Sequence, residues 1–268
     1  SFGAEAADQW DAVLNRAERM WDVSREPFVE SELKSPLSLL KRRHILRDLR
    51  IIAPRATLRD FGLQNPYLAK IMDRYATYSG SDPRKAPAVL STIAFIEEAF
   101  GAWHIKGGIG TLSERIAERC EKVGVAIHLN SPIAAINLKG NMVIGITTAS
   151  GENINADMVI SNVDAGLTYN KLISKPTRKV KRVRRELSKL EPSLAGFSLL
   201  IGLRPSSDPG LSHHTILFPD DYDAEFESIF TTKAPVEKPT IYICSPNDSA
   251  MVKSEGHEAL FVLVNAPR

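Results

Sequence analysis

Three closely spaced glycines in the segment 103–136, "WHIKGGIGTLSERIAERCEKVGVAIHLNSPIAAI", could form part of a ligand-binding turn. Gly107, Gly108 and Gly110 form a turn that opens an amphipathic helix, and an apolar strand is expected after that helix. Glycines let the backbone approach a ligand closely, and the N–H groups at a helix start attract anions. The turn therefore suggests a phosphate contact, while a turn shaped only for close helix packing stays open as the alternative.

The segment does not satisfy the full dinucleotide-binding fingerprint. That fingerprint needs GxGxxG after a strand and an acidic residue at the end of the next strand. Ser113 stands where the third glycine belongs, and the residues before the turn read as helix and loop. The expected strand after the helix ends in Asn130 and Ser131 rather than in a carboxylate. We therefore do not expect this segment to bind a dinucleotide on its own.

A second group of reactive side chains is the pair His213 and His214. Neighbouring residues of a strand point to opposite faces, so we do not expect the two imidazoles to share a metal ion. No Cys, Asp or Glu lies near them at the spacing of a metal site, and we predict a structural role and no metal. No Ser-His-Asp, paired-carboxylate or Cys-His arrangement is present at motif strength, so no catalytic residue is nominated.

Composition and charge narrow the class of protein further. The formal net charge is +2, which gives no global reason to expect a nucleic-acid partner. Cys120 and Cys244 lie far apart with no CxxC motif, which favours a reduced, cytoplasmic setting. The longest apolar run, "AGFSLLIGL", is far shorter than the roughly 20 residues that cross a bilayer. Any membrane contact is therefore expected to be peripheral.

A basic helix is predicted over residues 177–190, "TRKVKRVRRELSKL". Its apolar residues fall on one stripe, and Arg182, Arg184 and Arg185 belong to the basic face opposite. A solvated surface helix is one reading of this pattern. Contact with anionic lipid is the other, since clustered basic residues near a membrane contribute about 1 kcal/mol each.

The elements that must position these residues change in kind along the chain. Apolar residues recur at helical spacing through the first hundred residues, with breaks at Pro and Gly. The glycine turn and a helix over residues 111–123 then precede short apolar or alternating runs, which predict strands. We expect a mixed α/β (α+β) fold with strands at "VAIHL", "AAINLKG", "MVIGITT", "ENINA", "DMVISN", "AGFSLLIGL", "HTILFP", "TIYIC" and "ALFVLVN".

Several stretches of the chain form a pattern in a fixed order. They are "YATYSGSDPRKAPAVLSTIAFIEEAFGAWHIKGGIGTLSERIA", "GVAIHLNSPIAAI", "ADMVISNVDAGLTYNKL", "SHHTILFPDDYDAEFESIF", and "IYICSPNDS" with "GHEALFVLVNAP". These stretches resemble the phytoene desaturase or carotenoid desaturase family, which consists of FAD-dependent, amine-oxidase-like flavoproteins. Because the stretches are separate and run through almost the whole chain, the resemblance is specific.

The resemblance implies the middle part of a two-domain FAD-dependent oxidoreductase. Residues 1–100 would form the helical part of the substrate domain, and residues 166–268 its β-sheet part. Residues 101–165 would form an inserted segment of the FAD-binding domain, made of the glycine turn, the helix and a β-meander. The family's amino-terminal GxGxxG region and carboxy-terminal FAD segment are missing from this reading. We therefore interpret the chain as a central fragment that holds FAD weakly by itself.

The resemblance also implies cofactor contacts. The glycine turn becomes a secondary contact with FAD, and Ile133 matches a position whose backbone meets the adenine, although a core strand residue would look the same. Asp164 and its neighbour Asn162 follow an apolar run, where ligands of open α/β sheets collect. Asp164 also suits the cap of the next helix, and we assign it both roles. The expected contacts are Gly107, Gly108, Gly110, Ile133, Asn162 and Asp164.

The expected substrate contacts are Tyr75, Tyr78 and Trp103, beside the glycine turn. Core packing is the alternative for any one of them. As a group, with the helix over residues 86–100, they suit an apolar tunnel for a long polyisoprenoid or carotenoid, because aromatic faces pack well along a conjugated chain.

The activity that the resemblance implies is dehydrogenation of a C–C unit of a polyisoprenoid, with FAD taking the hydride. Because related folds keep the scaffold and change the substrate, other activities stay open. They are a carotenoid isomerase and a desaturase of another lipid. A non-catalytic lipid-binding module is an alternative from a different class.

Overall fold

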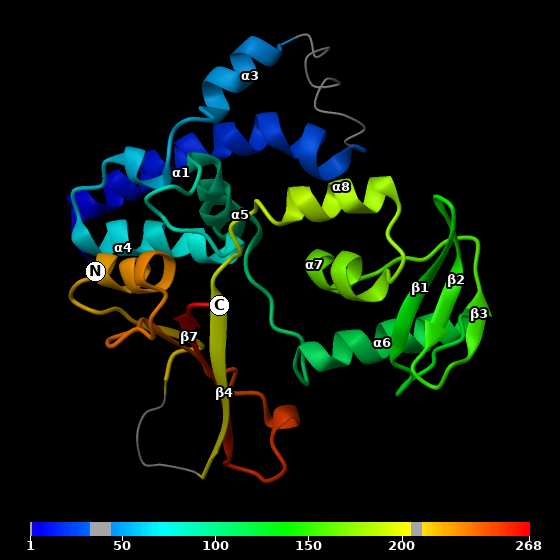
Figure 1. Ribbon diagram of the computed structural model, residues 1–268. Helices are drawn as coiled ribbons and strands as arrows, with labels where there is room; N and C mark the ends of the chain where they lie inside the picture. The colour runs from blue at the N-terminus through cyan, green and yellow to red at the C-terminus, as the bar shows by residue number, and fades with distance from the viewer. Residues whose placement is uncertain (1, 33–43, 205–210) are drawn as a thin grey trace. The chain divides into compact units, whose positions relative to one another are not determined.

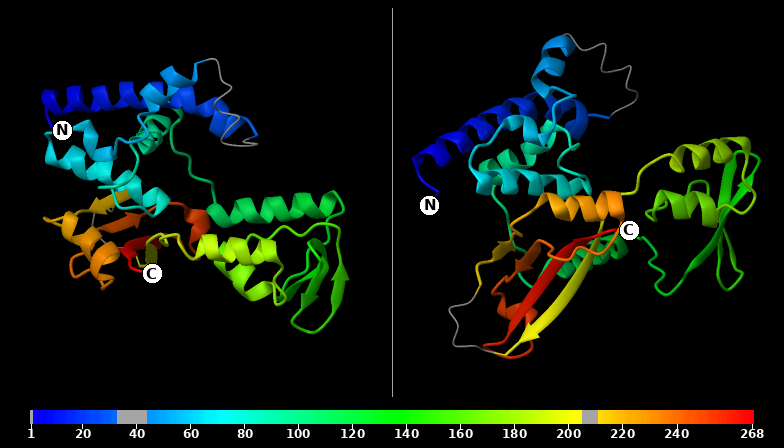
Figure 2. Two further views of the ribbon diagram at one scale, coloured as in Figure 1. Left: turned by 45° about the horizontal axis from the view of Figure 1, so that its top comes forward. Right: turned by 60° about the vertical axis from the view of Figure 1, so that its left-hand side comes forward.

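The computed structural model contains two compact units, and Figures 1 and 2 show their elements. Unit 1 joins Ser1–Thr111 to Ser193–Arg268, and unit 2 is Leu112–Pro192. Both units combine helices with antiparallel strands, which confirms the mixed α/β class expected from the sequence. The structure describes residues 2–32, 44–204 and 211–268.

The first part of unit 1 is helical, as its apolar spacing predicted. The long helix α1 (Ala4–Arg25) buries Val13, Ala17 and Met20 along one face and packs against α5 (Thr92–Phe100). This spacing of three or four residues places apolar side chains on one stripe of a helix. The other elements of this part are a π-helical turn (Glu26–Glu30), α3 (Ile45–Ile52), α4 (Pro66–Arg74) and 3-10 turns at Leu58–Phe61, Tyr75–Ser79 and Ala88–Ser91.

The start of α4 follows directly from the local sequence. The Asn65 side chain accepts hydrogen bonds from the backbone N–H groups of Tyr67 and Leu68, and Pro66 occupies the first helical position. Both features favour a helix start at this point. Helix α4 then supplies Met72 to the buried core of the helical part, whose other members are Val13, Leu58, Tyr75, Ala76, Ala86 and Ala94.

Four antiparallel strands form the sheet of unit 1 in the order β4-β7-β6-β5. Strands β4 and β7 pair along their whole lengths, and the right-hand view of Figure 2 shows them side by side in yellow and red. Three lie within apolar runs that predicted strands, and β7 extends one residue beyond its predicted run at each end. Their bounds are β4 (Ala195–Leu203), β5 (His214–Leu217), β6 (Ile241–Cys244) and β7 (Glu258–Ala266).

A short helix, α9 (Asp223–Phe226), is tied to this sheet by one buried carboxylate and continues into a π-helical turn (Glu227–Thr232). Glu225 is 1% exposed and accepts hydrogen bonds from the backbone N of Thr240 at 2.7 Å and from Nδ2 of Asn265 at 2.8 Å. Buried carboxylates need such donors, because an unpaired buried charge is costly. Glu225 therefore joins the helix to the start of β6 and to β7.

Unit 2 contains the antiparallel meander β1-β2-β3, visible in green in Figure 1. Helix α6 (Ile109–Lys122) runs into this unit from the glycine turn. Two helices follow the meander and are joined by the π-helical turn Thr168–Leu172. The remaining bounds are β1 (Ile133–Lys139), β2 (Met142–Thr148), β3 (Asn153–Asn155), α7 (Ala165–Leu167) and α8 (Arg178–Leu187).

Two strands expected in unit 2 do not form. The runs "VAIHL" (residues 125–129) and "DMVISN" (residues 157–162) have no strand assignment, and neither pairs with a strand in the described part of the chain. Leu129 and Ile160 are 80% and 88% exposed. A strand needs a neighbour for its N–H and C=O groups, and the pairings of the meander engage other residues.

The limits of unit 2 differ from the segment 101–165 drawn from the sequence. The unit continues to Pro192 because helix α8 packs against α7 and against the Thr168–Leu172 turn, which in turn contacts β1. A basic helix far from the glycine turn in sequence thus belongs with the meander. Assignment of residues 101–165 to an FAD-binding domain stays a prediction.

Candidate functional site

The glycine turn has the backbone conformation that its residue types predicted. Gly107 and Gly108 have φ angles of 85° and 87°, which side chains with a Cβ rarely adopt. The N–H of Gly107 donates to Oδ2 of Asp248 at 2.6 Å, and that of Gly108 donates to the carbonyl of Ile105 at 2.8 Å. Two of the three amides are thus bonded within the protein. A Cβ at Gly110 would meet no atom within 4 Å, so the turn is open at that residue.

Asp248 fixes the glycine turn, and the sequence argument missed it. Besides the Gly107 amide, its carboxylate accepts from Nε2 of His104 at 2.9 Å and from the N–H of Ala250 at 2.9 Å. The His104 hydrogen bond first, and the two backbone N–H groups after it, lower the pKa of Asp248 to about 2. Asp248 and Gly107 are 141 positions apart, so no local pattern could pair them.

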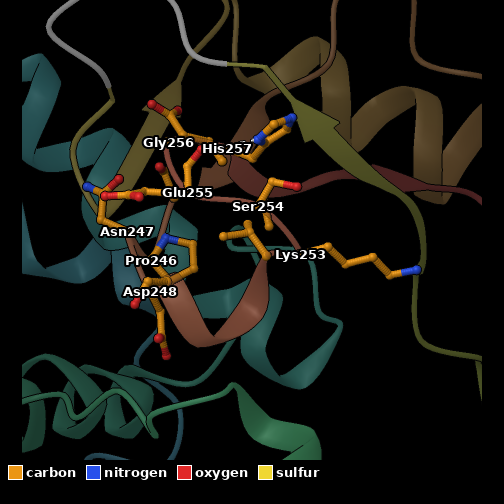
Figure 3. Close-up of a pocket in the computed structure, with 13 residues that line it drawn as sticks. Pro246, Asn247, Asp248, Lys253, Ser254, Glu255, Gly256 and His257 are labelled. Carbon is orange, nitrogen blue, oxygen red and sulfur yellow. Dashed lines mark hydrogen bonds between the residues drawn. The ribbon is translucent and has the colours of Figure 1, made fainter.

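Asp248 also belongs to a loop that surrounds a hollow of about 570 Å³ (Figure 3). Every residue lining the hollow lies within residues 245–259, with Lys253 and Glu255 beside Pro246 and Val252. Its walls therefore mix charged, polar and apolar groups and define no single class of ligand. The loop matters to the candidate site through Asp248, which contacts the glycine turn.

The other three expected cofactor residues lie in unit 2. Ile133 begins β1 and pairs with Thr148 of β2. Asn162 is exposed, and Asp164 caps α7 by accepting from the N–H of Leu167 at 3.2 Å. The capping role expected for Asp164 is therefore present. A shared flavin contact of these residues with the glycine turn stays a prediction.

The three aromatic residues expected at the substrate have different surroundings. Tyr75 belongs to the buried core, and its OH donates to Oε2 of Glu97 at 2.9 Å. Tyr78 is exposed, stacks on Tyr75 with ring centroids 5.9 Å apart, and donates to Oε1 of Glu97 at 3.0 Å. Burial first, and the Glu97 charge second, raise the pKa of both phenols. Trp103 is 88% exposed, and its Nε1 donates to the Phe100 carbonyl.

The two histidines lie against each other, contrary to the sequence argument. Nδ1 of His213 is 3.0 Å from Nε2 of His214, and Nδ1 of His214 is 2.7 Å from the OH of Tyr242. Alternation along a strand does not separate them, because His213 lies in a bend and β5 begins only at His214. Burial first, and the neighbouring His213 second, lower the pKa of His214.

The basic face of α8 requires one correction. Arg184 is half-buried, and its guanidinium donates to the carbonyls of Tyr169 at 2.8 Å and Ile173 at 2.7 Å. It therefore fixes the π-helical turn instead of facing solvent with Arg182 and Arg185, which are exposed.

Among the described helices, none is long and apolar enough to cross a membrane.

Comparison with known families identifies the class of protein to which these elements belong. Residues 8–196 match the family described as flavin containing amine oxidoreductase. The chain belongs to this family, and the resemblance seen in the sequence is thereby confirmed. In structure, the chain is similar to an oxidoreductase from Methanosarcina mazei, with a TM-score of 0.58 and 16% identity over 85% of this chain and 53% of that one. This likeness supports the fold.

Within the family, the chain is similar to enzymes of carotenoid chemistry. It is 30% identical to the 1-hydroxycarotenoid 3,4-desaturase of Flavobacterium sp. (strain P99-3), over 100% of this chain and 56% of that enzyme. It is also 30% identical to the 4,4'-diaponeurosporene oxygenase of Staphylococcus aureus (strain USA300), over 78% of this chain and 41% of that enzyme. The chain thus spans about half the length of these relatives.

Proposed function

We propose that this chain is the middle part of an FAD-dependent oxidoreductase that dehydrogenates a C–C unit of a polyisoprenoid. The observation that carries the proposal is its likeness, over its whole length, to the 1-hydroxycarotenoid 3,4-desaturase. Another relative is named as an oxygenase, so the fold alone does not decide between dehydrogenation and oxygenation.

Apolar surface in unit 1 supports an apolar substrate. Strand β4 is an edge strand, and Phe197, Leu199 and Leu203, which alternate onto one face of it, are 60%, 46% and 39% exposed. On the other face, Leu200 of β4 and its register partner Phe261 of β7 are 83% and 37% exposed. Large exposed apolar side chains in a cluster mark ligand or partner surfaces. A long hydrocarbon chain fits such a surface better than a charged substrate does.

The residues of the chain fit a secondary contact with the flavin. When bound, FAD supplies the hydride acceptor. The chain would hold it through the open backbone at Gly110 and through the backbone at Ile133, where β1 begins. The amides of Gly107 and Gly108 are already bonded within the protein, so their contribution is the shape of the turn. For this reason we expect the chain alone to bind FAD weakly.

Replacing Gly110 by valine tests this function in the full-length protein. A valine side chain would fill the open space through which the flavin is proposed to approach the Gly110 backbone. We therefore expect FAD affinity to fall at least tenfold, which corresponds to about 1.4 kcal/mol of binding free energy. Gly108 is less useful as a test because its positive φ would itself strain a valine. FAD affinity is measured by fluorescence titration. Product formation from an acyclic carotenoid is followed by mass spectrometry, because each dehydrogenation removes a pair of hydrogens and lowers the mass of the carotenoid accordingly.

Gly202→Val is the matched control. A Cβ at Gly202, on β4, also meets nothing within 4 Å, and valine suits a strand. Its flavin affinity is expected to equal that of the unmodified protein. If the full-length protein binds a polyisoprenoid but retains no flavin and forms no product, the lipid-binding module replaces the enzyme as the preferred function.

We also propose that α8 contacts anionic membrane lipids, from which a water-insoluble substrate would be drawn. Lys181 and Arg185 are exposed on α8, whereas Arg184 is engaged with carbonyl groups. Lys181→Gln together with Arg185→Gln is expected to weaken binding to anionic vesicles roughly 30-fold, at about 1 kcal/mol per charge. Co-sedimentation at low salt measures this. Equal binding by this variant and by the control Lys233→Gln with Lys238→Gln would leave α8 a solvated helix.

A further inference from the structure

Two imidazoles and one thiol converge at one end of the sheet in unit 1. His213, His214 and Cys244 each offer a ligand atom, and these atoms all lie within 4.8 Å of one another. Cys244 ends β6 and stands opposite His214 in the strand register, which places both on the same face. His213 reaches them from the bend before β5. The cluster brings together residues 30 positions apart that no sequence motif links.

Hydrogen bonds do not satisfy this cluster completely. A neutral imidazole has one donor nitrogen and one acceptor nitrogen. If the Tyr242 hydroxyl donates to Nδ1 of His214, then Nε2 of His214 donates to Nδ1 of His213, and Nε2 of His213 carries a proton. If instead Nδ1 of His214 donates to Tyr242, then Nδ1 of His213 donates to His214, and Nε2 of His213 is an acceptor. In both arrangements Nε2 of His213 is buried and has no hydrogen-bond partner among the described residues. This atom is not one of the two facing ring nitrogens, so the case for a bound ion rests on the spacing of Nδ1 of His213, Nε2 of His214 and the Cys244 sulfur.

The ligand types and their spacing fit a metal ion. Two nitrogens on one tetrahedral ion lie roughly 3.3 Å apart, given bonds of about 2.0 to 2.1 Å. The facing ring nitrogens of His213 and His214 are 3.0 Å apart. The Cys244 sulfur lies within 4.8 Å of the ligand nitrogens, and with a Zn–S bond of about 2.3 Å it would have to move toward them by rotation about the Cys244 side-chain bonds. Imidazole and thiolate together select zinc or a similar transition metal over magnesium or calcium.

We propose that His213, His214 and Cys244 form a binding site for one zinc-class divalent ion. Three protein ligands leave a fourth position for water, which is the pattern of an open zinc site. Binding converts the Cys244 thiol to thiolate and releases one proton to solvent. The ion undergoes no redox change, so no further reactant is needed.

Neighbouring side chains already orient the ligands. The Tyr242 hydroxyl holds Nδ1 of His214 at 2.7 Å and leaves Nε2 directed at the cluster. The ring of His104, itself held by Asp248, packs edge-on against His213 with centroids 5.6 Å apart. Such outer contacts fix ring orientation at metal sites, and their loss costs roughly 10- to 100-fold in affinity.

Metal titration of the chain without flavin tests the site separately from the proposed function. The reduced chain is expected to bind one Zn²⁺ by elemental analysis, and Co²⁺ is expected to give a thiolate-to-cobalt charge-transfer band. Cys244→Ser should abolish this band and weaken Zn²⁺ binding at least 100-fold. Tyr242→Phe should weaken it roughly 10-fold or more. Cys120→Ser is the matched control, because Cys120 lies on α6, and it should change neither.

X-ray absorption of the unmodified zinc-loaded chain keeps the test decisive if a variant fails to fold. One sulfur and two imidazole nitrogens around the ion are expected. A substoichiometric metal content, an oxygen-only shell, or a cobalt band that survives Cys244→Ser would overturn the site. A flavin-binding or desaturation failure has no bearing on these readouts, so the two proposals stand or fall independently.

Discussion

Replacing Glu225 by alanine is expected to lower the free energy of unfolding of unit 1 by about 3 kcal/mol. Its carboxylate is 1% exposed and is the acceptor for the backbone N of Thr240 and for Nδ2 of Asn265, which are also buried. Alanine leaves both donors without an acceptor, and each unsatisfied buried group costs about 1 to 3 kcal/mol. Urea unfolding followed by tryptophan fluorescence measures the loss, because all three tryptophans lie in unit 1.

Glu227→Ala is the matched control two positions along the same segment. Glu227 is half exposed and pairs with Nη1 of Arg84 at 3.1 Å. Exposed ion pairs contribute about 1 kcal/mol or less, so a small change is expected. If Glu225→Ala cost no more than this control, the buried carboxylate would not be what ties α9 to the sheet.

The elements with a local signal could be predicted from the sequence. Three examples are the apolar stripe of α1, the asparagine and proline at the start of α4, and the apolar runs that became β4 and β7. Each of these signals consists of residues that are close to one another in the sequence. The run "VAIHL" has the same apolar character as β6, "IYIC", yet only β6 forms a strand. The difference is that β6 has β5 and β7 on either side. Pairing partners are set by tertiary contacts that a single run does not encode.

The candidate site was predictable where residue type alone decides the backbone. Gly107 and Gly108 take the positive φ angles that glycine allows. Asp248, the hydrogen-bond partner of Gly107, could not be found, because it comes from a loop with no periodic pattern. The expectation that His213 and His214 point to opposite faces was wrong for a different reason. Side chains alternate between faces only within a strand, and β5 begins at His214, so His213 lies outside it and its ring contacts that of His214.

Replacing Gly145 by alanine is expected to lower the free energy of unfolding of unit 2, which contains the meander, by about 3 kcal/mol or more. Gly145, on β2, pairs with Asn137 of β1 and Asn155 of β3 at a φ of 145°. A Cβ there would lie 2.1 Å from the carbonyl oxygen of Ile154. The obstacle is backbone, so β3 itself must move, and overpacking of about 1 to 3 kcal/mol adds to backbone strain of similar size.

Gly151→Ala separates the two causes in this prediction. Gly151 has a φ of 90°, but a Cβ there meets nothing within 4 Å, so only the strain of about 1 to 3 kcal/mol applies. Gly145→Ala should therefore cost clearly more. Because unit 2 contains no tryptophan, Gly145→Ala should change the far-ultraviolet circular dichroism transition and leave the tryptophan transition in place. Equal costs for the two glycines would mean that β3 yields freely, and a matching shift in the tryptophan transition would mean that the units unfold together.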